Sequence, residues 1–200
     1  MTSHIADTAD RLLRRGRLLE WATLLWNVVA VVVLAVLALR ASSVALAGFG
    51  LDSLIEIGAS SVVLWELAGT GEQRQRTALR LIGVAFTALG VYLLVQSTTA
   101  LVSAHHAQTS VGGIIWTTAT AVVMFCLAAG KHQTGRALGN PVLETEGRVT
   151  FVDGLLAVAV LVGISLNALV GWWWADPIAG YVIVFYAFRE AMHIFRPSHH

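Results

Sequence analysis

Six long apolar stretches, separated by short polar connections, are the feature that most limits what this chain can fold into. They cover approximately residues 18–39, 44–67, 81–103, 111–130, 149–171 and 175–194. A helix of about 20 apolar residues is long enough to cross a hydrocarbon layer about 30 Å thick. A mean hydropathy of +0.72, with only 12% charged residues, is not that of a soluble domain. We therefore predict an all-α, polytopic membrane protein with six transmembrane helices.

The basic residues predict the orientation of these helices, because short cytoplasmic connections retain Lys and Arg. All but one of the 13 Lys and Arg residues flank the apolar stretches on the same side, and the exception is Arg40. Both termini are thus expected in the cytoplasm. Residues 1–17 form a cytoplasmic segment in this scheme, residues 18–194 the transmembrane domain and residues 195–200 a short cytoplasmic tail. We expect a multi-pass protein of the plasma membrane.

The sequence GNPVLETEGR marks the start of the fifth helix. Asn140 is a suitable N-cap, and Pro141 suits the first helical position. Glu144, Glu146 and Arg148 would then lie on a cytoplasmic extension of the helix, which is expected to enter lipid at about Val149.

Two acids interrupt the second apolar stretch, in GLDSLIEIGASS. Asp52 and Glu56 are four residues apart, so on a helix they lie on the same face. A charged acid near the bilayer centre costs at least roughly 2.5–3.5 kcal/mol on insertion scales. No Lys or Arg is expected deep in any of the six stretches. The countercharge is therefore predicted to come from outside the chain, as a metal ion or as protons.

A third acid, Asp153, lies in the fifth stretch at a depth similar to that of Glu56 when residues are counted along antiparallel helices. Asp52, Glu56 and Asp153 together could supply three oxygen ligands to a divalent cation. Protonated acids that hydrogen bond between helices are the structural alternative. Glu146 lies two turns before Asp153 on the same face. It could collect cations at the cytoplasmic mouth, although a solvated helix charge is the simpler interpretation.

Several other classes of function find no support in the sequence. A net charge of +1 does not favour nucleic acid as a partner. We find no nucleophile with a positioned base and no phosphate-binding loop, so an enzyme is not expected, and neither is a prosthetic group. The single cysteine cannot form an internal disulfide.

The acids and their surroundings resemble the transmembrane part of the cation diffusion facilitator family. The resemblance runs through GLDSLIEIGASS, VTFVDGLLAVAVLVGISLN and WWADPIAGYVIVFYAFRE. It implies a six-helix transporter that moves zinc and related divalent metals, generally out of the cytoplasm in exchange for protons. It also implies that Asp52, Glu56 and Asp153 are metal ligands.

The sequence departs from the family pattern in two places. The fifth helix of the family usually carries His or Asp, followed four residues later by Asp. Asp153 fills the second of these positions, and Val149 fills the first, where the family has a ligand. The family generally adds a C-terminal cytoplasmic domain, whereas this chain is expected to lack one, so a homodimer would have to form through the membrane helices.

We therefore expect a secondary transporter of divalent cations in the lipid bilayer, with Zn²⁺ first and Mn²⁺ or Fe²⁺ next as cargo. All-oxygen ligands favour the harder ions, and the resemblance favours zinc. Two alternatives stay open, a membrane scaffold that does not transport and a proton pathway that needs no metal. The metal, the direction, the proton stoichiometry and the oligomeric state are likewise open.

Overall fold

The computed structural model describes the chain except for residues 1, 42–43, 70, 105–109 and 196–200. Six α-helices make up nearly all of the described part, which contains no strand. Their bounds are α1 Thr2–Ala41, α2 Val44–Leu67, α3 Glu72–Ser103, α4 Val111–Leu138, α5 Pro141–Val170 and α6 Ala175–Phe195. The prediction of an all-α protein built on six helices is confirmed.

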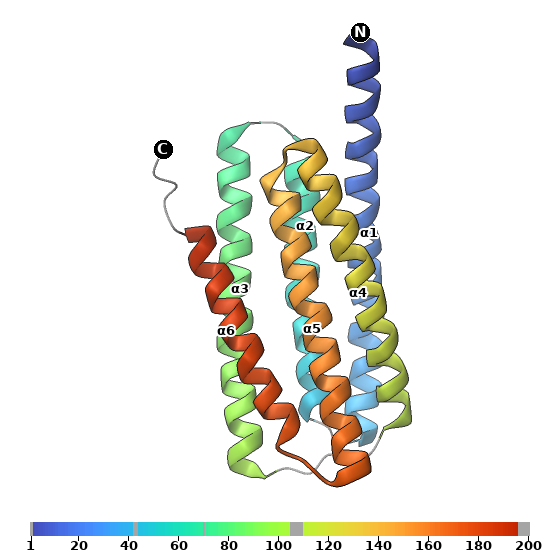
Figure 1. Cartoon of the computed structure of the whole chain (residues 1–200), viewed down its shortest axis with the longest axis vertical. Helices are drawn as coiled ribbons and strands as arrows, with labels where there is room; N and C mark the ends of the chain where they lie inside the picture. The colour runs from blue at the N-terminus through green and yellow to red at the C-terminus, as the bar shows by residue number, and fades with distance from the viewer. Residues whose placement is uncertain (1, 42–43, 70, 105–109, 196–200) are drawn as a thin grey trace.

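Consecutive helices run in opposite directions along one bundle (Figure 1). The α2–α3 and α4–α5 connections lie at the same end as the start of α1 and the end of α6. This is the end predicted to be cytoplasmic, and we call it the inner end. Helix α1 begins at Thr2 and projects beyond the other helices, so residues 2–17 continue the first helix. Of the predicted tail at 195–200, only Phe195 is among the described residues.

Five described stretches are long and apolar enough to cross a membrane. They are Ala9–Ala41, Leu46–Leu67, Glu72–Ser103, Val111–Leu138 and Pro141–Val170. Large apolar side chains point outward from them, as Leu18, Leu25, Val32 and Leu39 do along α1. In water such a surface would promote aggregation, whereas hydrocarbon solvates it. The arrangement is that of a multi-pass membrane protein.

The start of α5 agrees with the sequence prediction. The Asn140 side chain accepts hydrogen bonds from the backbone amides of Val142 and Leu143 (2.9 and 3.0 Å), and Pro141 occupies the first turn. Two otherwise unsatisfied amides are thereby paired. The preceding helix ends at Gly139, whose φ of 62° is the left-handed conformation that glycine adopts without strain. The end of α4 and the start of α5 are therefore fixed by the two adjacent capping residues Gly139 and Asn140.

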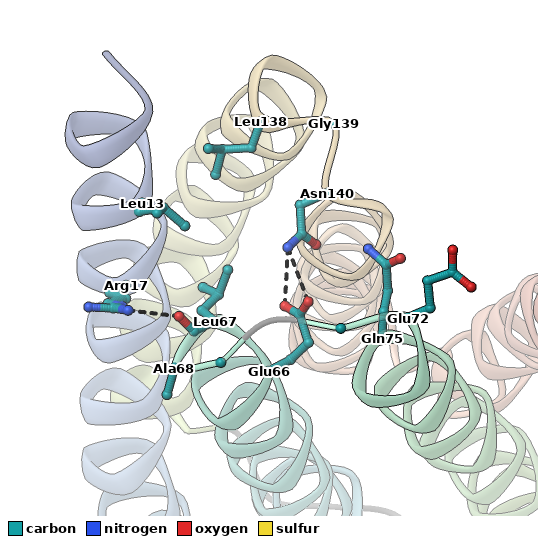
Figure 2. A pocket seen from close by; sticks show the side chains of 12 residues that line it. Leu13, Arg17, Glu66, Leu67, Ala68, Glu72, Gln75, Leu138, Gly139 and Asn140 are labelled. Carbon is teal, nitrogen blue, oxygen red and sulfur yellow. Dashed lines mark hydrogen bonds between the residues drawn. The ribbon is translucent and has the colours of Figure 1, made fainter. Parts of the chain in front are cut away.

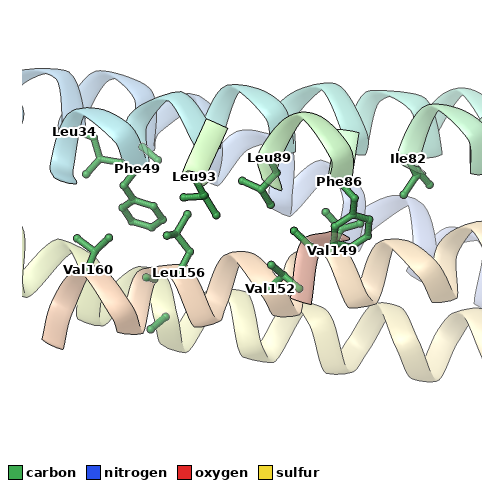
Figure 3. Packing of buried hydrophobic residues seen from close by; sticks show 14 of the residues in the cluster. Leu34, Phe49, Ile82, Phe86, Leu89, Leu93, Val149, Val152, Leu156 and Val160 are labelled. Carbon is green, nitrogen blue, oxygen red and sulfur yellow. The ribbon is translucent and has the colours of Figure 1, made fainter. Parts of the chain in front are cut away.

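Helix α5 lies inside the bundle, packed against α4, α6, α2 and α3. Its approach to α4 is close because glycines line the contact: a Cβ on Gly135 would overlap the backbone of Glu144, and one on Gly147 would overlap that of His132. Small residues are what membrane helices use to reach van der Waals contact, since lipid provides no hydrophobic driving force between them. The apolar core around α5 includes Leu34, Phe49, Phe86, Leu156 and Val160 (Figure 3).

Candidate cation site

The inward face of α2 carries a line of polar side chains. Asp52, Glu56 and Ser60 follow one another at intervals of four residues, so they lie on one face, and all three are buried, with at most 3% exposed. The side chain of Tyr92 of α3 interacts electrostatically with Asp52. The Gln96 amide of α3 packs against Gly48, one turn before Asp52, where a Cβ would overlap it. Helix α3 thus places the polar side chains of Tyr92 and Gln96 beside the face of α2 that carries the acids.

Asp153 of α5 meets this face. Its side chain is 2% exposed, and its carboxyl group lies close enough to the Asp52 carboxyl for the two to interact electrostatically. Among the described residues, Asp52 Oδ2 and both carboxyl oxygens of Asp153 are buried without a hydrogen-bond donor. Two carboxylates cannot face each other in a low dielectric without a proton or a cation between them. We call Asp52 and Asp153 the acid pair.

Glu56 is turned toward a different partner. Its Oε1 accepts a hydrogen bond from the Thr150 hydroxyl at 2.8 Å, and its charge also interacts with that of Asp153. Within the described part of the chain, no group of three or more His, Cys, Asp or Glu side chains converges tightly enough to hold one metal ion. The three predicted ligands therefore form a pair with a third acid beside it.

A second buried cluster lies closer to the inner end and is centred on Lys131 of α4. The Lys131 Nζ lies 3.0 Å from Glu20 Oε2 of α1 and 3.3 Å from Glu146 Oε1 of α5, and it donates to the Thr150 hydroxyl at 2.9 Å. The contacts with Glu146 and Thr150 are hydrogen bonds, whereas that with Glu20 is an ion pair whose carboxyl oxygens have no hydrogen-bond donor among the described residues. Glu20, Lys131 and Glu146 are each 0% exposed, and we call them the lysine cluster.

The lysine cluster corrects two predictions. Lys131 follows the fourth apolar stretch and was one of the Lys and Arg residues predicted to flank the stretches on the cytoplasmic side, with no basic residue deep in the bundle. Helix α4 instead continues two turns past residue 130, and Lys131 is buried in the interior. Glu146 was expected to be a solvated charge, and it is instead fully buried and ion-paired. The physical reason is the close α4–α5 hairpin, which turns these two side chains toward each other. A part for Glu146 in collecting cations stays a prediction.

Sequence reasoning missed Glu20 and Thr150 as well as Lys131. Glu20 was an acid within an apolar stretch, so the criterion that selected Asp52 and Glu56 would also have selected it. Thr150 carried no comparable signal, because threonine is an ordinary residue in membrane helices. Its importance comes from its position between Lys131 and Glu56.

The buried charges do not balance. Apart from Glu66 near the inner end, the described interior holds one lysine and five buried carboxyl groups, those of Glu20, Asp52, Glu56, Glu146 and Asp153, with a net charge of −4 if all were ionised. Within the lysine cluster, the single ammonium of Lys131 compensates one of the two carboxyl charges. The acid pair lies two turns away along α5, about 10 Å from Glu146 at 1.5 Å per residue. Protons or a cation from outside must therefore neutralise it.

Val149 fills the position where the family resemblance implies a fourth ligand. It is 3% exposed and belongs to the apolar core, where Figure 3 shows it with Phe86 and Val152. A valine offers no lone pair, so this position contributes packing only.

A pocket of about 570 Å³ lies at the inner end, between the start of α1 and the α2–α3 and α4–α5 connections (Figure 2). Its acids are Glu66 and Glu72. Glu66 accepts two hydrogen bonds from the Asn140 amide (3.1 and 3.3 Å), and Arg17 donates to the Leu67 carbonyl at 2.7 Å. Two of its lining residues, Arg17 and Asn140, lie on the inner-end side of Glu20 and Glu146 along the chain.

Comparison with known proteins identifies the family. A family model described as the cation efflux transmembrane domain matches residues 80–199, which include Asp153 but not Asp52 or Glu56. No curated protein matches the chain. The match covers more than half of the chain, over helices that here form an antiparallel membrane bundle around buried acids. The chain belongs to the cation efflux family of membrane transporters.

Proposed function

We propose that this protein is a secondary transporter that moves divalent metal cations out of the cytoplasm across the plasma membrane in exchange for protons, with Zn²⁺ as the first candidate cargo and Mn²⁺ or Fe²⁺ next. The observation that carries the proposal is the acid pair. Asp52 and Asp153 bring two carboxyl groups together from different helices, both buried and with donor-free oxygens.

Metal and protons are alternative occupants of this pair. With a divalent cation between them, both carboxyls are ionised and neutralised. Without it, mutual repulsion in a poorly polar interior favours at least one bound proton, shared by the group rather than by one residue. Binding of one occupant therefore releases the other, which is the elementary requirement for exchange.

Glu56 is the natural third ligand, since it lies one turn from Asp52 on the same face of α2. Two or three carboxylates leave room for water in the coordination shell, which suits Mn²⁺ and Fe²⁺, and the family relationship supports Zn²⁺.

The test is cation flux into proteoliposomes with an imposed pH gradient, comparing the wild type with Asp52→Asn for Zn²⁺, Mn²⁺ and Fe²⁺ while internal pH is followed. Asp10→Asn is the matched control, because it removes an exposed carboxyl from α1. We expect metal flux with opposite proton movement in the wild type and the control, and neither in Asp52→Asn.

A metal-independent proton pathway is the second candidate. It is favoured by the run of hydrogen-bonded groups from Lys131 through Thr150 to Glu56, which continues electrostatically to Asp153. Proton flux that metal does not alter would support it over exchange. Absence of both fluxes in vesicles that contain folded protein would favour the non-transporting scaffold.

A further inference from the structure

We infer that Thr150, held by Lys131, is a latch that keeps Glu56 away from the acid pair until a cation binds. The inference rests on the proposed function and assigns Thr150 a positioning role in it. Thr150 is fully buried at the junction of the lysine cluster and the acid pair, and it contacts both sides: its hydroxyl accepts from Lys131 and donates to Glu56.

The direction of the hydroxyl follows from its two partners. A threonine hydroxyl has one hydrogen, and an ammonium can only donate to it. Because Lys131 Nζ lies 2.9 Å from Thr150 Oγ1, the hydroxyl hydrogen is left for Glu56 Oε1, 2.8 Å away. The positive charge behind the hydroxyl polarises it and strengthens the bond that it donates.

Lys131 is itself held in place. It donates a second hydrogen bond to Glu146 of α5 and is ion-paired with Glu20 of α1. The ammonium therefore cannot leave Thr150 without breaking a buried ion pair. The chain of contacts from α1 through α4 and α5 to α2 fixes the position of the hydroxyl.

The consequence concerns how the cation site assembles. In this structure the acid pair has two carboxyls together and Glu56 engaged elsewhere, and no three acids converge among the described residues. A cation held by Asp52 and Asp153 would attract Glu56 away from Thr150. The hydrogen bond thus opposes closure of the site, so removing it should make cation binding tighter.

The central variant is Thr150→Val, which replaces the hydroxyl by a methyl group of similar shape. Breaking one charge-assisted hydrogen bond of the unbound state should tighten the dissociation constant by about tenfold or more. Thr150→Ser, which keeps the hydroxyl, should restore the wild-type value. Thr117→Val is the matched control, since Thr117 is also buried but donates to the Gly113 carbonyl of its own helix.

The measurement is calorimetric titration of the purified full chain in detergent with Zn²⁺ and separately with Mn²⁺ at one fixed pH. Infrared spectroscopy of the metal-free protein adds a readout that does not depend on binding. The Glu56 carboxyl band, assigned by its loss in Glu56→Gln, should shift in Thr150→Val but not in Thr117→Val.

The outcomes separate the latch from the proposed function. Tighter binding in Thr150→Val together with the infrared shift supports the latch. Unchanged or weaker binding by a folded Thr150→Val protein overturns it and leaves the transporter proposal standing, because Thr150 would then be neutral or a ligand. If the wild type binds neither metal, the proposed function fails and the latch fails with it. An unshifted Glu56 band overturns the latch whatever the affinity.

Discussion

The acid pair and the lysine cluster are both groups of buried carboxyls that join helices, yet they differ in one residue type. The lysine cluster contains its own cation, with Lys131 between Glu20 and Glu146. The acid pair has none, and Asp52 Oδ2 and both carboxyl oxygens of Asp153 lack donors among the described residues. A buried carboxylate requires a countercharge in either place. Where the chain supplies that countercharge the cluster can be structural, and where it does not the site is open to an ion from solution.

The largest expected effect is on the lysine cluster. Lys131→Met leaves Glu20 and Glu146 buried without a cation, and losing one partner of a buried ion pair costs about 3–5 kcal/mol of stability. The measurement is the free energy of unfolding in detergent. The triple variant Glu20→Gln, Lys131→Met, Glu146→Gln removes all three charges and should recover much of the loss. Equal stability of Lys131→Met and the wild type would contradict a structural role for the cluster.

The next largest effect is expected at the acid pair, where a substitution should reduce cation flux without reducing stability. Asp153→Asn should lower cation flux by at least about tenfold, since even indirect partners of a metal site change affinity by that amount. Its stability should equal or exceed that of the wild type, because a carboxyl that faces another carboxyl is replaced by a neutral donor. Flux into proteoliposomes and the unfolding free energy are measured on the same preparation, with Asp10→Asn as the control. If the Asp153→Asn variant lost stability and kept its flux, the acid pair would be structural and would not be the cation site.

Val149→His sharpens the comparison by adding a ligand where the acid pair lacks one. The new imidazole should raise the affinity for Zn²⁺ more than that for Mn²⁺, since nitrogen ligands suit zinc. Val149 is part of the core, so we expect about 1–3 kcal/mol of lost stability from overpacking. Competitive titration of the two ions gives the selectivity. Val149→Leu, which changes size without adding a ligand, should show the packing cost with unchanged selectivity.

The smallest effect is expected at the α4–α5 hairpin. Asn140→Ala removes the N-cap of α5, which typically costs about 1 kcal/mol. The variant also loses the hydrogen bonds to Glu66, but it leaves both buried groups of charges intact. Stability should fall slightly while cation affinity stays at the wild-type value. A large change in affinity would mean that the inner-end pocket takes part in binding.

Much of the fold could be predicted from the sequence because its signals are local. A helix in lipid must be long and apolar, so the six helices were visible in the hydropathy. The start of α5 was visible in Asn140 and Pro141, since a cap acts within one turn. The burial of Asp52 and Glu56 on one face followed from their spacing of four residues.

The lysine cluster could not be predicted in the same way. Lys131 and Glu146 flank a loop in the sequence, and polar residues near a loop are usually solvated. Only the contact of α4 with α5, and of α4 with α1, makes them interior residues. Thr150 likewise gains its role from neighbours 19 residues before it and 94 residues before it in the chain.

The sequence by itself determined that this chain crosses a membrane as a set of helices and that carboxyls lie within those helices. The tertiary structure alone decided which carboxyls meet each other and which meet a lysine. The physical reason is that hydropathy and capping depend on neighbours within a turn or two, whereas charge compensation in a low dielectric depends on which helices pack together. Here that packing gives Glu20 and Glu146 an internal cation and leaves Asp52 and Asp153 without one.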